Sequence, residues 1–458
     1  MLSELRELRI GIVPTRREMF DHPKAVEQKI EIIKKMGEFE RKFSFTGVYI
    51  EDVNPEGLIM RYDEAFAVEG KMRENKVDAL FFPHCNFGQE EAIARLAKNL
   101  GVPVLVWGPR DAAPNGIEMR PTDSQCGMFA STKVLGRYGV TYSYIENCRL
   151  DDPVFEDGFE SFLQVVSVVK TFRNMRVAVV SARPKEFMSV MVNEAELLEK
   201  FDIEIVPAES TVITGMIDWH LANNKEGIDG QLKELTDRGI DLSRLGDKKR
   251  SMAAIKLAMK EFAEKNRCVC IASECWKLFK SRYGIAPCFV FGELNDALIP
   301  TACETDVHGA VMGALAVAAK RFTVPSYVAD LTIRHPEDDN VELLWHCGPF
   351  AKSLIRKNAG GYVAEGGQGF YEIEHGEQTV LRFDGARGDY FMFAGTGRGI
   401  DGPVTNGNYL WLEVDDWVRW EKKFIFGPYI HHVIGIPGDV TETMREACRY
   451  IGVTFDPA

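Results

Sequence analysis

The sequence predicts an α/β protein with two doubly wound α/β domains, followed by a β-rich, antiparallel barrel-like C-terminal domain. Up to about residue 322, apolar strand-like runs alternate with helical patterns, which is typical of parallel sheets covered by helices. Beyond that point, short β-like runs are separated by Gly-rich turns, which indicates a mostly antiparallel barrel or sandwich. The predicted domains are therefore residues 1–170, 171–322 and 323–458.

The first domain alternates between short apolar strands and longer helical patterns. The predicted strands are 8–15, 45–52, 77–84 and 102–109, and the predicted helices are 24–41, 62–75 and 89–100. No G-x-G-x-x-G motif follows the first strand, so dinucleotide binding is not supported. In open α/β sheets, ligands bind beyond the carboxyl ends of the strands. Ordinary loop chemistry explains polar residues at these ends equally well.

The second domain repeats this alternation and ends in an acidic stretch. It starts with a strand at 175–184 and a helix at 192–201, and a helix at 251–265 leads into an apolar strand at 268–275. An apolar, strand-like run that ends near Ile299 precedes the acidic residues Glu304 and Asp306. A helix of small residues follows at 308–319. The third domain then carries the β-like runs and closes with a helix at 440–450.

Composition excludes several classes of function. Hydrophobic residues make up 45% and charged residues 27% of the 458 residues, an ordinary globular balance. The net charge of −13 argues against nucleic acid or an anionic membrane as the main partner. No apolar run approaches the roughly 18 residues of a transmembrane helix, and the first residues lack a signal-peptide pattern. The ten cysteines form no C-x-x-C pair, which argues against a zinc ribbon. Cys268 and Cys270 share one face of an apolar strand pattern, so we expect reduced core thiols and a cytoplasmic location.

Two carboxylates flank the small-residue helix and are candidate metal ligands. Glu304 precedes this helix, and Asp330 interrupts the apolar strand pattern YVADLTI. A carboxylate in a buried strand is costly unless it is paired or bound to a cation. The alternative is that Glu304, Thr305 and Asp306 simply cap the helix.

The adjacent pair His431 and His432 lies in the apolar run YIHHVIGI. In a strand, neighbouring side chains point to opposite faces, so at most one of the two enters a site. Two carboxylates and one imidazole suit a hard divalent cation such as Mn²⁺ or Mg²⁺, whereas zinc more often has further His or Cys ligands.

Several motifs together make the chain similar to the L-fucose isomerase and L-arabinose isomerase superfamily. They are IGIVPTRR, FFPHCNFGQE, ACETDVHGAVMGAL, VADLT, LLWHCGPF and IHHVIGIPGD. The resemblance covers nearly the whole chain and implies a metal held by Glu304, Asp330 and one His. The family pattern His-x-Val favours His431, with His432 as the alternate. Mn²⁺ is the expected ion, with Mg²⁺ or Co²⁺ as alternatives.

The resemblance also implies an activity, aldose–ketose isomerisation through an ene-diol, with L-fucose or D-arabinose as first candidates. Glu304 and Asp330 would then be both ligands and the acid/base pair. It further implies a homotrimer or homohexamer, because N-terminal loops of one subunit complete a neighbour's site. The expected substrate contacts are Arg16, Arg17, His84, Asn86, Phe87, Gln89, Trp107 and His346.

Two other functions remain open from the sequence. One is a non-catalytic sugar-binding or regulatory protein on the same scaffold. The other is an enzyme that acts on a sulfonated or phosphorylated sugar, whose anionic group would bind to basic side chains. The candidates for that contact are Arg16, Arg17, Arg110 and Lys185.

Overall fold

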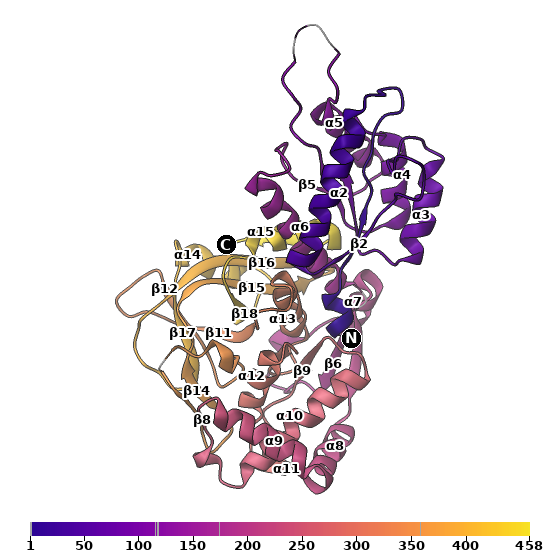
Figure 1. Cartoon of the computed structure of the whole chain (residues 1–458). Coiled ribbons are helices and arrows are strands. Elements are labelled where there is room, and N and C mark those ends of the chain that lie inside the picture. Colours follow the sequence, from indigo (N-terminus) through magenta and orange to yellow (C-terminus); the bar gives the residue numbers. More distant parts are fainter. Residues whose placement is uncertain (1, 115, 117–118, 174, 358) are drawn as a thin grey trace. The chain divides into compact units, whose positions relative to one another are not determined.

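The computed structural model describes residues 2–114, 116, 119–173, 175–357 and 359–458. The chain divides into two compact units, an N-terminal unit of residues 3–170 and a C-terminal unit that contains residues 171–458. Figure 1 shows the N-terminal unit in indigo to purple and the C-terminal unit from magenta to yellow. Within the described ranges, no helix has both the length and the apolar character needed to cross a membrane.

The N-terminal unit contains a five-stranded parallel sheet in the order β2-β1-β3-β4-β5. Its strands are β1 (Arg9–Ile12), β2 (Thr46–Val48), β3 (Ala79–Pro83), β4 (Val104–Trp107) and β5 (Ser143–Tyr144). Its helices are α1 (Leu2–Arg6), α2 (Lys24–Phe43), α3 (Glu64–Glu74), α4 (Glu90–Leu100), α5 (Ser124–Arg137) and α6 (Pro153–Phe172). One apolar cluster joins α2 and α6 to the sheet, and another joins α3, α4 and α5 to it. Helices therefore cover both faces, as a doubly wound fold requires.

The α/β part of the C-terminal unit has a four-stranded parallel sheet in the order β10-β9-β6-β7. Its strands are β6 (Arg176–Val180), β7 (Glu204–Ala208), β9 (Cys270–Ser273) and β10 (Thr301–Ala302). Its helices are α7 (Glu194–Phe201), α8 (Ser210–Asn223), α9 (Lys225–Asp237), α10 (Lys248–Lys265), α11 (Leu278–Tyr283), α12 (Cys288–Asp296) and α13 (Val307–Ala319). Every residue of α13 is buried. This explains its small, apolar residues.

One predicted element differs in type. The apolar run before the acidic stretch is helix α12 followed by the two-residue strand β10, and not one strand that ends near Ile299. Residues 288–295 of α12 are all buried. A helix that is apolar on every side shows no period of 3.6, so its sequence resembles that of a buried strand.

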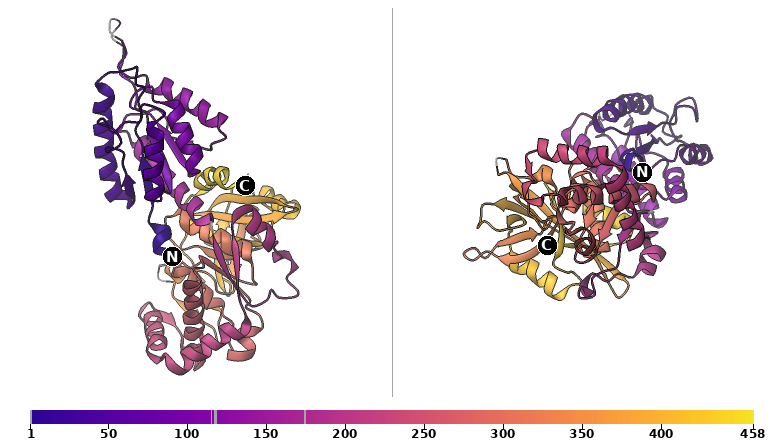
Figure 2. Two further views of the ribbon diagram at one scale, coloured as in Figure 1. Left: turned by 90° about the vertical axis from the view of Figure 1, so that its right-hand side faces the viewer. Right: turned by 90° about the horizontal axis from the view of Figure 1, so that it is seen from below.

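The β-rich part contains a closed six-stranded antiparallel barrel. The order is β16-β15-β18-β11-β12-β17, and pairing of β16 with β17 closes it. These strands are β11 (Tyr327–Arg334), β12 (Val341–His346), β15 (Gly376–Ala386), β16 (Asp389–Ile400), β17 (Asn408–Glu413) and β18 (His432–Pro437). Four shorter strands extend the sheet: β8 (Ile240–Asp241), β13 (Gly361–Val363), β14 (Gly369–Glu372) and β19 (Thr454–Pro457). Two helices, α14 (Trp417–Phe426) and α15 (Thr441–Ile451), complete this part (Figure 2). The predicted fold class is confirmed.

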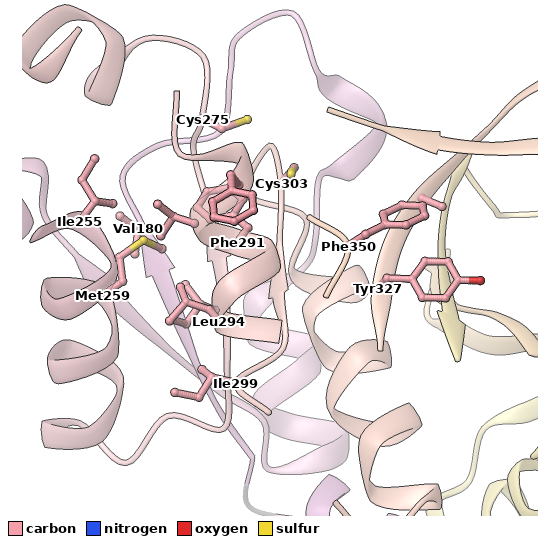
Figure 3. Packing of buried hydrophobic residues seen from close by; sticks show 14 of the residues in the cluster. Val180, Ile255, Met259, Cys275, Phe291, Leu294, Ile299, Cys303, Tyr327 and Phe350 are labelled. Atoms are coloured by element: carbon pink, nitrogen blue, oxygen red, sulfur yellow. The ribbon is translucent and has the colours of Figure 1, made fainter. Parts of the chain in front are cut away.

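The α/β part and the barrel share one hydrophobic core. It runs from Val180 and Met259 in the α/β part to Tyr327 and Phe350 on the barrel side (Figure 3). The ring centroids of Tyr327 and Phe350 are 4.5 Å apart. Residues 171–322 and 323–458, which the sequence predicts as separate domains, therefore stabilise each other as one compact unit.

Candidate metal centre

The loop between β10 and α13 brings two carboxylates to the carboxyl edge of the parallel sheet. Glu304 and Thr305 have φ angles of 52° and 60°, which is rare for residues with a side chain. Asp306 caps α13, since its Oδ1 accepts the N–H of Gly309 at 2.9 Å. A Cβ on Gly309 would lie 2.6 Å from Asp306 Oδ2, so glycine allows this close approach. Asp306 therefore serves as the N-cap of α13, and Glu304 takes no part in this cap.

Three neighbouring barrel strands supply the remaining polar side chains. Asp330 lies on β11, between β12, which ends at His346, and β18, which begins at His432. Asp330 and His432 are direct partners in the antiparallel register. Directly opposed residues on antiparallel strands bring their side chains close together. The pairing of β11 with β12 and β18 therefore brings together side chains that are far apart in the sequence.

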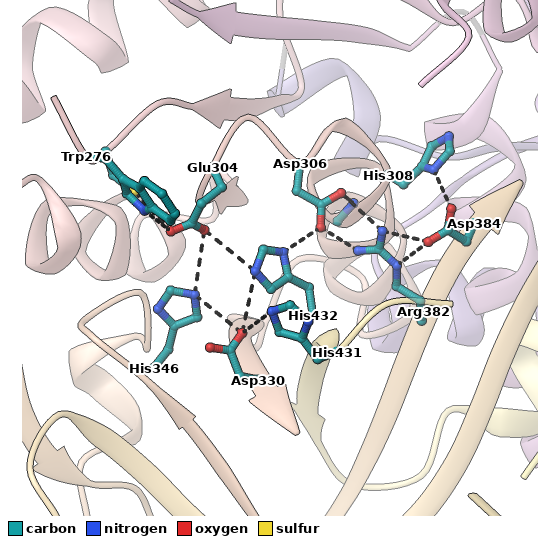
Figure 4. A network of polar contacts seen from close by, with 12 residues as sticks. Trp276, Glu304, Asp306, His308, Asp330, His346, Arg382, Asp384, His431 and His432 are labelled. Atoms are coloured by element: carbon teal, nitrogen blue, oxygen red, sulfur yellow. Dashed lines mark hydrogen bonds and ion pairs between the residues drawn. The ribbon is translucent and has the colours of Figure 1, made fainter. Parts of the chain in front are cut away.

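Glu304, Asp330, His346 and His432 converge on one point (Figure 4). His432 Nε2 lies 3.5 Å from Asp330 Oδ1 and 3.6 Å from Glu304 Oε2. His346 Nε2 lies 3.8 and 4.0 Å from the same two oxygens. Ligand atoms bound at 2.0–2.3 Å to one ion are separated by about 3–4.5 Å. Ligand atoms within 4.8 Å of one another form two groups that share His432, namely Glu304–His346–His432 and Asp330–His431–His432. Around His432 the spacing is therefore that of a coordination sphere.

Buried atoms of this cluster lack hydrogen-bond partners. Glu304 Oε2, Asp330 Oδ1 and His346 Nε2 are buried and unpaired among the residues that the structure describes. Unpaired buried polar atoms are rare in native proteins because each costs about 1–3 kcal/mol, and more when charged. A divalent cation satisfies both carboxylates at once, so the residues present fit the metal that the family resemblance implies.

His432 is held in the tautomer that a metal requires. Its Nδ1 donates to Asp306 Oδ2 at 3.0 Å, which leaves the lone pair of Nε2 directed at the cluster. Burial raises the pKa of Asp306, but the charge of Arg382 and the hydrogen bond from His432 outweigh this effect and hold that pKa well below its usual range. Asp306 therefore stays ionised as the acceptor.

A buried chain of charges continues behind Asp306. Arg382 donates to Asp306 at 3.2 Å and to Asp384 at 2.8 Å, and Asp384 accepts from His308 Nδ1 at 2.9 Å (Figure 4). The relative exposure of these side chains is at most 8%. Each buried charge thus has a partner of opposite sign or a hydrogen bond, as stability in a low-dielectric interior requires.

The other two histidines have different environments. His346 Nδ1 accepts the N–H of Cys347 at 2.9 Å, so Nε2 carries a proton and faces the cluster as a donor. His431 Nε2 is 4.0 Å from Asp330 Oδ1, but its side chain is 46% exposed. Burial lowers the pKa of His431. His432 thus has the orientation of a ligand, while His431 lies at the rim.

Two aromatic residues that the sequence reasoning missed also contact the cluster. Trp276 donates from Nε1 to Glu304 Oε1 at 2.9 Å and thereby turns Oε2 toward the histidines. The ring of Phe187 stacks on His432 with centroids 5.2 Å apart. Both residues follow parallel strands, Trp276 after β9 and Phe187 after β6, and this position at carboxyl ends was the available signal.

Four of the predicted substrate contacts form a cluster within the N-terminal unit. Arg16 is buried and donates to Glu56 at 2.7 and 2.9 Å. Arg17 lies over the ring of Phe87, with its guanidinium carbon 4.1 Å from the centroid. Asn86 accepts the backbone N–H of Arg17 at 2.9 Å. These residues hold one another in place at the carboxyl ends of β1 and β3.

The remaining predicted contacts of this unit are mostly internal. Burial lowers the pKa of His84 to about 4, and its Nε2 lies 2.8 Å from Ser131 Oγ. Trp107 is 0% exposed and donates to Cys148 Sγ at 3.4 Å, so it is a core residue. Gln89 is partly exposed at the start of α4. Of these three side chains, only Gln89 offers surface to a ligand.

Comparison with known proteins relates the chain to sugar isomerases. Residues 11–173 match the family model described as fucose/sulfoquinovose isomerase, N-terminal domain. The sulfoquinovose isomerase of Priestia megaterium is 22% identical over 419 residues, which cover 88% of this chain and 90% of that protein. The sulfoquinovose isomerase of Alkalicoccus urumqiensis is 23% identical over 383 residues, which cover 81% and 84%.

Proposed function

We propose that this chain, a member of the fucose-isomerase-like proteins, is a metal-dependent aldose–ketose isomerase whose substrate is a sulfonated aldohexose. The observation that carries the proposal is the convergence of Glu304, Asp330 and His432, with two unpaired carboxylate oxygens aimed at one point. Two carboxylates and one imidazole suit Mn²⁺, with Mg²⁺ or Co²⁺ as alternatives. A bound cation supplies Lewis acidity toward adjacent sugar oxygens.

The protein side chains have distinct roles in this proposal. Glu304 and Asp330 hold the cation, and a carboxylate at hydrogen-bond distance carries the proton between the two neighbouring sugar carbons. Trp276 fixes the orientation of Glu304, since its indole occupies Oε1. His346 donates Nε2–H to a sugar oxygen, in agreement with its predicted place among the substrate contacts. Burial of the cluster keeps water from competing for these groups.

The choice of substrate class rests on the relatives, which are named sulfoquinovose isomerases. An anionic sugar was one of the alternatives that the sequence left open. L-Fucose and D-arabinose, the first expectation, remain the neutral comparison substrates. The shared sequence extends over more than four fifths of this chain.

The test is an isomerase assay on protein stripped with EDTA and reloaded with Mn²⁺. Sulfoquinovose, D-glucose, L-fucose and D-arabinose are each incubated in D₂O, and NMR records both ketose formation and deuterium uptake at carbon 2. We expect turnover of sulfoquinovose only in the reloaded protein. Sugar binding without deuterium uptake would instead favour the non-catalytic sugar-binding function.

We also propose a homotrimer or homohexamer in the cytoplasm, in which N-terminal loops complete a neighbour's site. Support comes from the exposed apolar side chains near the metal centre, Met188 at 68%, Met191 at 58% and Trp276 at 38%. Such an exposed group favours a covering partner. Light scattering with parallel activity assays over a dilution series tests this, and an active monomer would contradict it.

A further inference from the structure

An anionic sugar needs a local positive charge in this protein. The chain carries a net charge of −13, and the carboxylates of Glu304 and Asp330 neutralise the proposed divalent cation, so the metal centre offers an anion no net positive charge. The negative field of the chain repels an anion unless basic side chains lie at the site. A basic side chain on a loop that borders the metal centre would supply the missing charge.

Loops at the carboxyl ends of β6, β9 and β10 carry three basic residues. They are Arg183 and Lys185 after β6 and Lys277 after β9, and the loop that holds Glu304 has none. Lys277 lies 3.7 Å from Glu186, so a carboxylate partly neutralises it. Throughout the described part of the chain, no carboxylate pairs with Arg183 or Lys185. These two cations remain available to a ligand.

A hydrogen bond ties the guanidinium of Arg183 to the turn that carries Phe187. Pro184 O accepts the N–H of Phe187 at 3.0 Å and also a hydrogen bond from Arg183 Nη1 at 3.0 Å. Because both donors share one oxygen, they lie within about 6 Å of each other. The Phe187 ring stacks on His432, 5.2 Å away. Arg183 is therefore anchored to the turn that covers a proposed metal ligand, while Lys185 is exposed within it.

We propose that Arg183 binds the anionic substituent of the sugar and selects sulfonated over neutral substrates, an inference that rests on the proposed isomerase function. Only Nη1 is bound to the turn, so Nε and Nη2 remain as a planar fork for two oxygens of one oxyanion. The reacting end of the sugar then lies at Glu304 and Asp330, and the charged end lies under the turn of residues 184–187.

The test compares Arg183→Gln and Arg183→Lys with the matched control Lys185→Gln, which removes the same charge two positions away. Calorimetry on Mn²⁺-loaded protein measures the binding of sulfoquinovose and of D-glucose, which lacks the sulfonate. Arg183→Gln is expected to reduce the preference for sulfoquinovose roughly 10- to 100-fold, the usual weight of a hydrogen-bonded charge. The preference of Arg183→Lys should lie between those of the wild type and Arg183→Gln, because an ammonium group keeps the charge but lacks the planar pair of donors. Lys185→Gln should keep the preference within about 3-fold, as expected for an exposed charge.

Separate outcomes distinguish this inference from the proposed function. If the wild type converts sulfoquinovose and Arg183→Gln keeps the wild-type preference, the proposed role of Arg183 is wrong but the proposed isomerase activity stands. If the wild type binds sulfoquinovose through Arg183 without converting any sugar, the proposed isomerase activity is wrong but the proposed anion site stands. A larger effect of Lys185→Gln, or no binding of sulfoquinovose by the wild type, overturns the inference.

Discussion

At the scale of single residues, Asp306 resolves the two interpretations that the sequence left open for the acidic stretch. Helix capping and metal binding both explain acids before a helix. The structure divides these roles, because Asp306 accepts the Gly309 N–H while Glu304 Oε2 has no hydrogen-bond partner among the described residues. The same Asp306 also orients His432. One carboxylate thus joins the start of α13 to a proposed metal ligand.

We predict that Asp306→Asn weakens Mn²⁺ binding about 10- to 100-fold, as loss of an outer-shell partner usually does. The matched control is Asp384→Asn, which also removes one carboxylate from Arg382 but does not touch His432. Titration calorimetry gives the affinity, and the melting temperature of the metal-free protein gives the structural cost. Equal affinities in the two variants would show that Asp306 acts only through Arg382.

Glu304→Gln and Asp330→Asn should each lower turnover by at least roughly 10²- to 10⁴-fold, because each removes both a ligand charge and a proton acceptor. His431→Ala should lower turnover much less, since that side chain is 46% exposed at the rim of the site. Single-turnover assays with circular dichroism as the folding control provide the measurement. Near wild-type turnover in either carboxylate variant would remove that residue from the mechanism.

At the scale of elements, the sequence predicts where the acids lie but not which histidine joins them. Asp330 in an apolar strand and Glu304 after a strand both follow from local patterns. The choice between His431 and His432 depends on the register of β11 with β18, which pairs Asp330 with His432. Register is a long-range property, so a local His-x-Val pattern does not determine it. Arg183, Phe187 and Trp276 were not singled out as site residues for the same reason, since loops meet only after the sheet forms.

Strand β12 contains a carboxylate that should make stability depend on pH. Glu342 is 3% exposed, and burial, with the nearby Glu421 adding to it, raises its pKa to about 8. The unfolded chain loses this proton near pH 4.5. Between these values the folded state binds more protons than the unfolded state, so this residue lowers stability as pH rises.

We therefore predict that Glu342→Gln raises the melting temperature by several degrees at pH 8.5 and has little effect at pH 4.5. The gain corresponds to a free energy of unfolding on the order of 2–4 kcal/mol, since one pKa unit equals about 1.4 kcal/mol and side-chain relaxation reduces the total. Melting curves of both proteins from pH 4.5 to 8.5 measure the difference. Parallel curves across that range would mean that Glu342 titrates normally.

At the scale of the whole molecule, the metal centre lies entirely within one compact unit. Glu304 comes from the α/β part, whereas Asp330, His346 and His432 come from barrel strands. The cation would thus bridge two parts that already share a hydrophobic core. The N-terminal unit has its own sheet and its own apolar clusters. Metal binding should therefore stabilise the two units unequally.

We predict that Mn²⁺ protects the C-terminal unit and leaves the N-terminal unit nearly unchanged. A ligand at 100 times its dissociation constant adds about 2.7 kcal/mol to the stability of the unit that binds it. Calorimetric melting with EDTA or Mn²⁺ should show one transition that moves upward by several degrees. Hydrogen exchange should slow in residues 303–309 and in β11, β12 and β18. Asp330→Asn is the control, because it keeps the shape of the site but removes one ligand charge, and its protection should be much smaller. Equal protection of residues 3–170, or full protection in Asp330→Asn, would place the ion outside the predicted centre.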